Sequence, residues 1–273
     1  MKKLLVLALA ASMTLGLAAC GSSSSDKAAE TAPAETTEGT DAAESTGSDK
    51  TWVIAMDTVF RPFEYTDEKG EFVGIDVDII KAVAANQGFN IEIQSLGWDA
   101  AVTAVQAGQA DALLAGASIT EERKANGWIF SDSYYDSYQV FAVKADSGIE
   151  SLDDLKGKTI AVKNATAGAN YAESLKDEYG FNITYFEDSP TMYQAVLGGQ
   201  CVACFEDTPI MKASIKDGGL ALKVLDDTAS DPAPYGFAIF SADSQELLDM
   251  FNAGLADIKA NGKYDEILAK YLG

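Results

Sequence analysis

The sequence predicts an α/β protein whose folded body consists of two lobes. Short, almost continuous apolar segments alternate with segments of helical periodicity, a pattern typical of open sheets covered by helices on both faces. The alternation runs through two blocks, which are bounded by turn-rich, tyrosine-containing segments at 131–139 and 231–236. A chain that crosses twice between two lobes forms a hinged pair, and α/β folds bind ligands in such a cleft. We therefore expect an interlobe binding site.

The first block begins with a buried strand and an amphipathic helix, in which Val77, Ile80 and Val83 share one face. The expected order is strand 51–55, helix 76–87, strand 91–94, helix 99–107 with Asp99 as its N-cap, and strand 110–115. The last residues predict a strand at 236–240 and helices at 243–260 and 263–272, too little for a third domain. They are expected to return to the first lobe.

The second block repeats this pattern. Its expected elements are strands at 159–162, 183–186 and 201–205, and helices at 168–178, 190–198 and after Pro209. The sequence thus predicts lobe 1 from residues 51–136 and 236–273, and lobe 2 from residues 137–235, joined by a two-strand hinge.

The N-terminal residues predict an export signal. Residues 1–19 combine two lysines, an apolar run and small residues before Cys20, and a transmembrane interpretation is marginal because polar residues dilute the run. The ending Leu-Ala-Ala-Cys resembles the lipobox of bacterial lipoproteins, which implies acylation of Cys20; the alternative is an incidental cysteine. Residues 20–50 lack aromatic and large aliphatic side chains, so we expect a disordered tether between the lipid anchor and the body.

Composition excludes several kinds of chemistry. The 273 residues include no histidine, which removes Ser-His-Asp triads, Cys-His pairs and imidazole metal sites. The formal charge of −22 repels phosphate backbones, so nucleic acid is not an expected partner.

Cys201 and Cys204 are three apart in an apparent strand, too far for a disulfide, and are expected to be buried apolar residues. The acid pair Asp76 and Asp78 is expected to be helix N-terminal charges or turns.

Four ordered segments carry a family resemblance. They lie at 56–79, 97–124, 152–172 and 205–215, and the match extends over nearly all of 51–273. The body resembles the extracellular solute-binding proteins of polar amino-acid ABC importers, in motif most of all the glutamine-binding and the lysine/arginine/ornithine-binding proteins. The resemblance implies the two-lobed periplasmic-binding-protein-like fold of type II.

A free amino acid presents a carboxylate and an ammonium group. The planar guanidinium of Arg123 can hold a carboxylate through two hydrogen bonds, and the Ser118 hydroxyl can add a third; the resemblance places both there. Asp207 is the expected partner of the ammonium group. The alternatives are an exposed Arg123 paired with Glu121 or Glu122, and a helix N-cap at Asp207.

Backbone N–H groups at a helix start near Thr166 and Ala167 also suit a carboxylate. By resemblance, the ligand side chain meets Asp57, Phe60, Trp98, Gly116, Lys163 and Glu206. The two aromatic rings would enclose its methylene chain, and Lys163 would neutralise Glu206. With Asp57, the pocket then has about one negative charge. This favours glutamine and tolerates arginine, lysine or histidine, with cystine as a further alternative.

These features predict a binding module without cofactor or metal, not an enzyme. The expected partners are a free polar amino acid, the permease subunits of an ABC importer and, through acylated Cys20, the outer face of the cell membrane. The protein is expected to be a monomer. The rivals are a cyclohexadienyl-dehydratase-like enzyme with Glu206 as general acid, and a sensor or adhesin that uses the same cleft.

Overall fold

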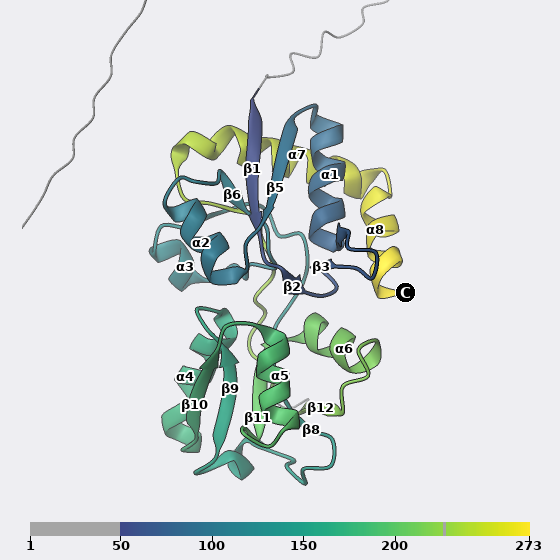
Figure 1. Ribbon diagram of the computed structural model, residues 1–273. Coiled ribbons are helices and arrows are strands. Elements are labelled where there is room, and N and C mark those ends of the chain that lie inside the picture. Colours follow the sequence, from purple (N-terminus) through teal and green to yellow (C-terminus); the bar gives the residue numbers. More distant parts are fainter. Residues whose placement is uncertain (1–49, 226–227) are drawn as a thin grey trace, which may run out of the picture. The chain divides into compact units, whose positions relative to one another are not determined.

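The computed structural model describes residues 50–225 and 228–273 (Figure 1). The predicted signal segment, the acylated Cys20 and nearly all of the tether lie outside these residues. The described chain contains two five-stranded sheets and a small three-stranded sheet. We call the part built on the sheet that contains β1 lobe 1 and the part built on the sheet that contains β9 lobe 2. The exact boundaries predicted at residues 136 and 235 stay a prediction.

The sheet of lobe 1 has the order β5-β1-β6-β13-β7. These strands are β5 (Asn90–Ser95), β1 (Thr51–Met56), β6 (Ala112–Leu113), β13 (Ala238–Ile239) and β7 (Ile129–Phe130). Strand β1 is parallel to β5 and β6, whereas β13 is antiparallel to β6 and β7. The C-terminal part of the chain therefore adds a strand to the first lobe, as the sequence predicts.

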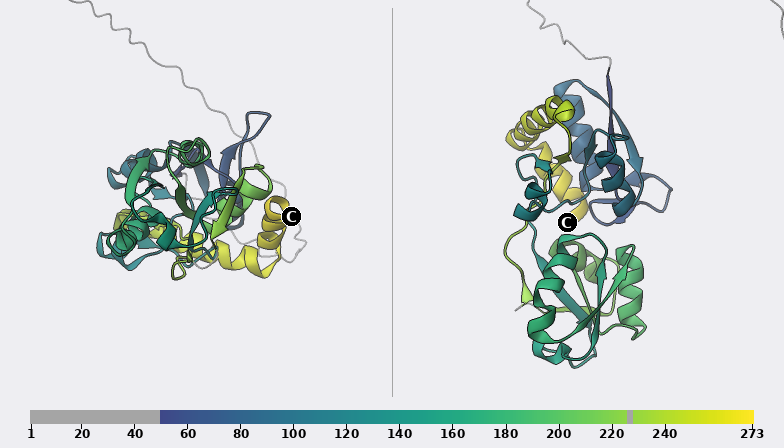
Figure 2. Two further views of the ribbon diagram at one scale, coloured as in Figure 1. Left: turned by 90° about the horizontal axis from the view of Figure 1, so that it is seen from below. Right: turned by 90° about the vertical axis from the view of Figure 1, so that its left-hand side faces the viewer.

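Alternation along β1 separates two apolar layers. Ile54 and Met56 face the helices α1 (Ile75–Gln87), α7 (Gln245–Ala260) and α8 (Lys263–Leu272), while Ala55 faces α2 (Trp98–Gln106). Figures 1 and 2 show the C-terminal helices beside α1. The sheet is thus covered on both faces, which explains why its central strands are apolar on both sides.

The small sheet is a meander between β1 and α1. It consists of β2 (Val59–Phe60), β3 (Glu64–Thr66) and β4 (Phe72–Val73), all antiparallel. Gly74 at the N-cap of α1 has a φ of 145°, and an added Cβ would lie 2.0 Å from the Phe63 carbonyl oxygen. Only glycine fits this approach of two backbones.

The sheet of lobe 2 has the order β10-β9-β11-β8-β12. These strands are β10 (Asn182–Phe186), β9 (Thr159–Lys163), β11 (Ala203–Asp207), β8 (Gln139–Lys144) and β12 (Leu222–Leu225). Helix α4 (Ala167–Tyr179) packs with one apolar layer, and α5 (Ser189–Leu197) and α6 (Thr208–Lys216) pack with the other. Strands β9, β10 and β11 are parallel, so their carboxyl ends share one edge.

Two extended segments connect the lobes. Tyr235 N–H donates to the Tyr135 carbonyl at 2.8 Å, and Ala233 N–H donates to the Ser137 carbonyl at 2.8 Å. Tyr135 and Tyr235 form an antiparallel bridge. The connection is therefore a pair of antiparallel chain segments, which permits bending with few contacts broken.

The predicted fold class is confirmed, with local corrections. Helix α2 begins at Trp98, and Gly97 with a φ of 81° occupies the N-cap position, so Asp99 is in the first turn instead of capping it. The strand predicted at 110–115 is regular only at 112–113, although Asp111 N–H and Leu114 N–H also donate to β1 carbonyls.

The strand predicted at 201–205 runs from Ala203 to Asp207. Cys201 therefore precedes the strand, so the predicted position of both cysteines in one strand is wrong. Cys201 and Cys204 are buried free thiols. Among the described residues, no helix has the length and apolar character needed to cross a membrane.

We predict that Gly74→Ala destabilises the fold by about 2–4 kcal/mol, because the Cβ collides with backbone that cannot move without breaking β3. Gly70→Ala is the matched control: Gly70 also has a positive φ, of 83°, but a Cβ there meets open space. It should cost only about 1 kcal/mol. Urea unfolding of both variants measures this difference, and equal stabilities would contradict the analysis.

Candidate functional site

A cavity lies at the carboxyl ends of β9 and β11, between residues of both lobes. It encloses about 380 Å³ of empty space including its mouth. Its lining consists of Phe60, Trp98, Ala115, Gly116, Ser118, Arg123, Gln139, Lys163, Thr166, Ala167, Gly168, Phe205, Glu206 and Asp207. Every predicted ligand-contacting residue except Asp57 is in this set.

Arg123 belongs to the short helix α3 (Glu121–Ala125), whose N-cap Thr120 accepts from Arg123 N–H. Its side chain is only 9% exposed. One Nη donates to the Ser118 carbonyl at 2.9 Å, and the guanidinium lies 4.7 Å from the ring centre of Trp128. Burial lowers the pKa of Arg123 to about 10, so the group stays charged at neutral pH. It is not the exposed residue of the alternative interpretation.

Asp207 is the last residue of β11 and stands at the N-cap position of α6, but its side chain makes no capping hydrogen bond. It accepts a hydrogen bond from Gln139 Nε2 instead. Burial, and secondarily the neighbouring Glu206, raise the pKa of Asp207 to about 7, against the opposing effect of Arg123. A cation placed beside this carboxylate would favour its ionised form.

Glu206 is held differently from the prediction. Its carboxylate accepts from the Tyr193 hydroxyl at 2.6 Å and from Asp207 N–H at 3.0 Å. Lys163 instead forms an ion pair with Asp57 of lobe 1. The predicted neutralisation of Glu206 by Lys163 is therefore wrong. The reason is that Asp57 comes directly after β1, at the edge of the sheet that faces the end of β9.

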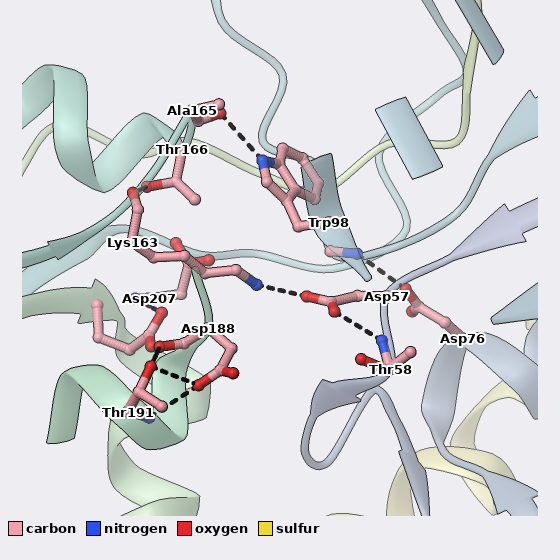
Figure 3. Close-up of polar contacts among 12 residues, drawn as sticks. Asp57, Thr58, Asp76, Trp98, Lys163, Ala165, Thr166, Asp188, Thr191 and Asp207 are labelled. Atoms are coloured by element: carbon pink, nitrogen blue, oxygen red, sulfur yellow. Dashed lines mark hydrogen bonds and ion pairs between the residues drawn. The ribbon is translucent and has the colours of Figure 1, made fainter. Parts of the chain in front are cut away.

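The Lys163–Asp57 pair is deeply buried, with the side chains 4% and 2% exposed (Figure 3). The ammonium nitrogen of Lys163 is 5.0 Å from the ring centre of Phe60 and 5.8 Å from that of Trp98. Lys163 thus places its charge between the two aromatic side chains that were predicted to enclose a ligand chain. Cation–π attraction and the ion pair both stabilise this position.

Further hydrogen bonds join the lobes around the cavity. Trp98 Nε1 donates to the Ala165 carbonyl at 3.1 Å (Figure 3). Asn164 Nδ2 donates to Asp99 at 2.8 Å. Ala165 has a φ of 54°, the left-handed conformation that favours glycine. The strained turn directs its carbonyl at the indole of Trp98.

The start of α4 closes one side of the cavity. Thr166 is its N-cap and accepts from Ala169 N–H at 3.1 Å, while its hydroxyl donates to the Lys163 carbonyl. The first N–H groups of a helix carry partial positive charge, so this end favours an anion. Gly168 permits close packing, because a Cβ there would be 2.6 Å from Gln139 Oε1.

Four lining residues were not predicted from the sequence: Ala115, Gln139, Gly168 and Phe205. The small residues and Phe205 carry no chemical signal of their own. Gln139 does, since it is a polar residue at the start of an apolar strand, directly after the turn-rich segment at 131–139. Its role becomes visible only through the pairing of β8 with β11, which sets Gln139 opposite Asp207.

The cavity therefore presents opposite charges to one small volume. Arg123 and the start of α4 favour an anionic group, whereas Asp207 and Glu206 favour a cationic one. A cavity of this kind between two hinged α/β lobes defines the class of two-lobed solute-binding proteins.

The chain belongs to family 3 of the bacterial extracellular solute-binding proteins, since the model of that family matches residues 52–273. The predicted recognition of this family is confirmed. The chain is 32% identical over 272 residues to the arginine-binding extracellular protein ArtP of Bacillus subtilis, covering 99% of this chain and 98% of that protein.

Two solved structures are also similar. Substrate-binding domain 2 of Lactococcus lactis GlnP, in an open conformation, is 40% identical, with a TM-score of 0.56 over 81% of this chain and 94% of that one. An ancestral arginine-binding protein bound to glutamine is 32% identical, with a TM-score of 0.73 over 82% of this chain and 98% of that one. The relatives named here are binding proteins or domains.

Proposed function

We propose that this protein captures a free polar L-amino acid, with glutamine favoured, and delivers it to the permease of an ABC importer. The observation that carries the proposal is the burial of Arg123 and Asp207 in one cavity. Isolated buried charges are costly, and a zwitterion supplies a partner for each. The arginine-binding relative and the glutamine-bound neighbour support this class of ligand.

The α-carboxylate would meet the guanidinium of Arg123, the hydroxyl of Ser118 and the first N–H groups of α4. The α-ammonium would meet Asp207, which Gln139 holds in place. These groups belong to both lobes, so a bound ligand bridges them. It stabilises the closed arrangement to the extent that it binds that arrangement more tightly than the open one.

The Lys163–Asp57 pair favours a neutral side chain. Lys163 already places a positive charge between Phe60 and Trp98, where the end of an arginine or lysine ligand would have to lie. A carboxamide fits this environment without removing the pair, because its oxygen can accept from Lys163 and its nitrogen can donate to Asp57. The alternative ligands are a cationic amino acid, as in the arginine-binding relative, and cystine.

The cellular setting follows from the family and the sequence signal. The family is extracellular, and the Leu-Ala-Ala-Cys ending supports a lipid anchor at Cys20. The tether then lets the monomeric body reach the permease from the outer face of the cell membrane. Residues 137–235 would move as one lobe against 51–136 and 236–273 when the cleft closes.

A thermal-shift screen tests the proposed function directly. The panel is the twenty amino acids with ornithine, citrulline and cystine. A ligand at a hundred times its dissociation constant adds about 2.7 kcal/mol of stability. We expect glutamine to give the largest rise in Tm. A screen in which no amino acid raises the Tm would contradict the proposal.

We predict that Arg123→Ala weakens binding of the selected amino acid at least about a hundredfold, because the carboxylate loses a buried charged partner. Isothermal titration calorimetry measures this. Arg61→Ala is the matched control: Arg61 is the second of the two arginines, is exposed and stacks on Tyr65 outside this cavity. It should bind like the wild type. Equal dissociation constants for all three proteins would refute the assignment.

Affinity should fall on acidification. The pKa of Asp207 is about 7. The ammonium group needs the ionised carboxylate, so below this pH binding must first remove a proton, and the dissociation constant should rise by about tenfold per pH unit. Titrations between about pH 5 and pH 8 measure this slope. Asp207→Asn should bind weakly with no such slope, and a wild-type affinity independent of pH would contradict the role of Asp207.

Removing the positive charge between the aromatic rings should change selectivity. We predict that Lys163→Met weakens glutamine binding and strengthens arginine binding, because Asp57 becomes free to pair with the ligand guanidinium. The ratio of the two dissociation constants should move at least about tenfold toward arginine. The control is Lys176→Met, which removes a half-buried lysine of α4 that does not line the cavity. An unchanged ratio in Lys163→Met would show that Lys163 does not select the ligand.

A further inference from the structure

A second pair of acids lies behind the cavity wall. Glu64 of β3 and Asp76 in the first turn of α1 are both 0% exposed. Asp76 Oδ2 accepts from Gly116 N–H at 2.9 Å and from the Tyr134 hydroxyl at 2.8 Å. Asp76 Oδ1 and both carboxyl oxygens of Glu64 have no donor among the described residues. Asp76 lies in the first turn of a helix, as the sequence predicts, and it is fully buried there.

The two carboxyl groups are neighbours, because the charge of Asp76 raises the pKa of Glu64. Ionised carboxylates only accept hydrogen bonds, so the three buried oxygens without a donor favour a proton on one of the two groups. The charged groups that face Glu64 are Asp76, Asp57 and Lys163, and the lysine is already paired with Asp57. On the other side, Asp76 faces the hydroxyls of Tyr134 and, farther away, Tyr264. In the described part of the chain, no lysine or arginine is therefore paired with Glu64 or Asp76.

The hydrogen bonds around the two carboxyl groups favour a shared proton on Glu64 over one on Asp76. Asp76 already accepts two hydrogen bonds from Gly116 and Tyr134, which stabilise its ionised form, whereas Glu64 accepts none. Burial first, and the neighbouring carboxylates second, raise the pKa of Glu64 well above its ordinary value of 4.5. Burial raises the pKa of Asp76 to about 6, against these hydrogen bonds.

We propose that Glu64 is a neutral carboxylic acid at neutral pH, that it donates its proton to Asp76, and that this shared proton fixes the wall of the ligand cavity. Glu64 is paired with Phe60 across the β2–β3 hairpin. Asp76 holds the turn at Gly116, which touches the Phe60 ring so closely that a Cβ would be 2.4 Å from it. The shared proton therefore connects the β2–β3 hairpin, which carries Phe60, to the turn at Gly116.

Glu64 and Asp76 are positioning residues, since neither lines the cavity. Their effect on the cavity wall rests on the proposed function, whereas the protonation of Glu64 does not. A buried acid with a raised pKa makes stability depend on pH. Above about 4.5 the unfolded chain loses the proton and the folded chain keeps it, so this acid lowers the stability as the pH rises, up to its pKa in the folded protein.

The test is the Tm of the full chain without ligand, measured from about pH 4.5 to about pH 8. Glu64→Gln keeps the shape and donates permanently from its amide nitrogen to Asp76, without an acid to ionise. We expect its Tm to exceed that of the wild type by about 2–4 °C or more at the upper pH and to approach it at the lower pH. The proposal would be overturned by a difference in Tm between Glu64→Gln and the wild type that does not change with pH. A lower Tm for Glu64→Gln at the upper pH would also overturn it.

Two further variants locate the proton and its role. Asp76→Asn weakens the acceptor of Gly116 and Tyr134, so we expect it to lower the Tm throughout this pH range; if it stabilises the protein while Glu64→Gln does not, the assignment to Glu64 is wrong. Glu64→Ala leaves Asp76 Oδ1 without a donor. It should bind the amino acid selected by the screen at least about tenfold more weakly than Glu64→Gln does. Equal affinities would overturn the positioning role while the Tm series still decides the protonation.

Discussion

The site depends on how the charges of the side chains that are buried between the two lobes are balanced. Five ionisable side chains meet between the lobes, and all are nearly buried: Asp57, Arg123, Lys163, Glu206 and Asp207. Lys163 and Asp57 satisfy each other across the lobes, and Glu206 is held by Tyr193 and a backbone N–H. Among the described residues, the hydrogen-bond partners of the Arg123 guanidinium and the Asp207 carboxylate are neutral groups. Arg123 and Asp207 are therefore suited to a dipolar solute. The Lys163–Asp57 ion pair limits which side chain that solute can carry.

The same principle explains the acids behind the wall. Lys163, the cation that faces Glu64, is paired with Asp57, so we propose that Glu64 and Asp76 share a proton, whereas the front of the site keeps its charges. A proton joins the Phe60 hairpin to the Gly116 turn without placing a cation near the ligand. With the proposed proton, the acid pair behind the wall carries a single negative charge, whereas the recognition surface on the other side carries charges of both signs.

The sequence predicts most of the fold because periodicity is a local property. The helices at 75–87 and 245–260 and the parallel strands follow from local apolar patterns, and the errors in them lie at ends such as those of β6 and β11. The strands β8 and β12 and the small sheet of β2, β3 and β4 were not predicted. Partners are not local. Arg123 and Asp207 could be predicted as site residues from their chemistry and the family motif. The partner of Lys163 could not: the sequence analysis pairs Lys163 with Glu206, whereas the strand order places Lys163 against Asp57. Gln139 and the buried state of Asp76 depend on pairings with distant residues in the same way.

The decisive measurement is a crystal structure of the protein with the amino acid that the screen selects. We expect the ligand carboxylate at about 3 Å from the guanidinium of Arg123 and the ligand ammonium at about 3 Å from the carboxylate of Asp207, with the Lys163–Asp57 pair intact. A ligand bound elsewhere, or one that leaves Arg123 and Asp207 turned away from each other toward water, would contradict it.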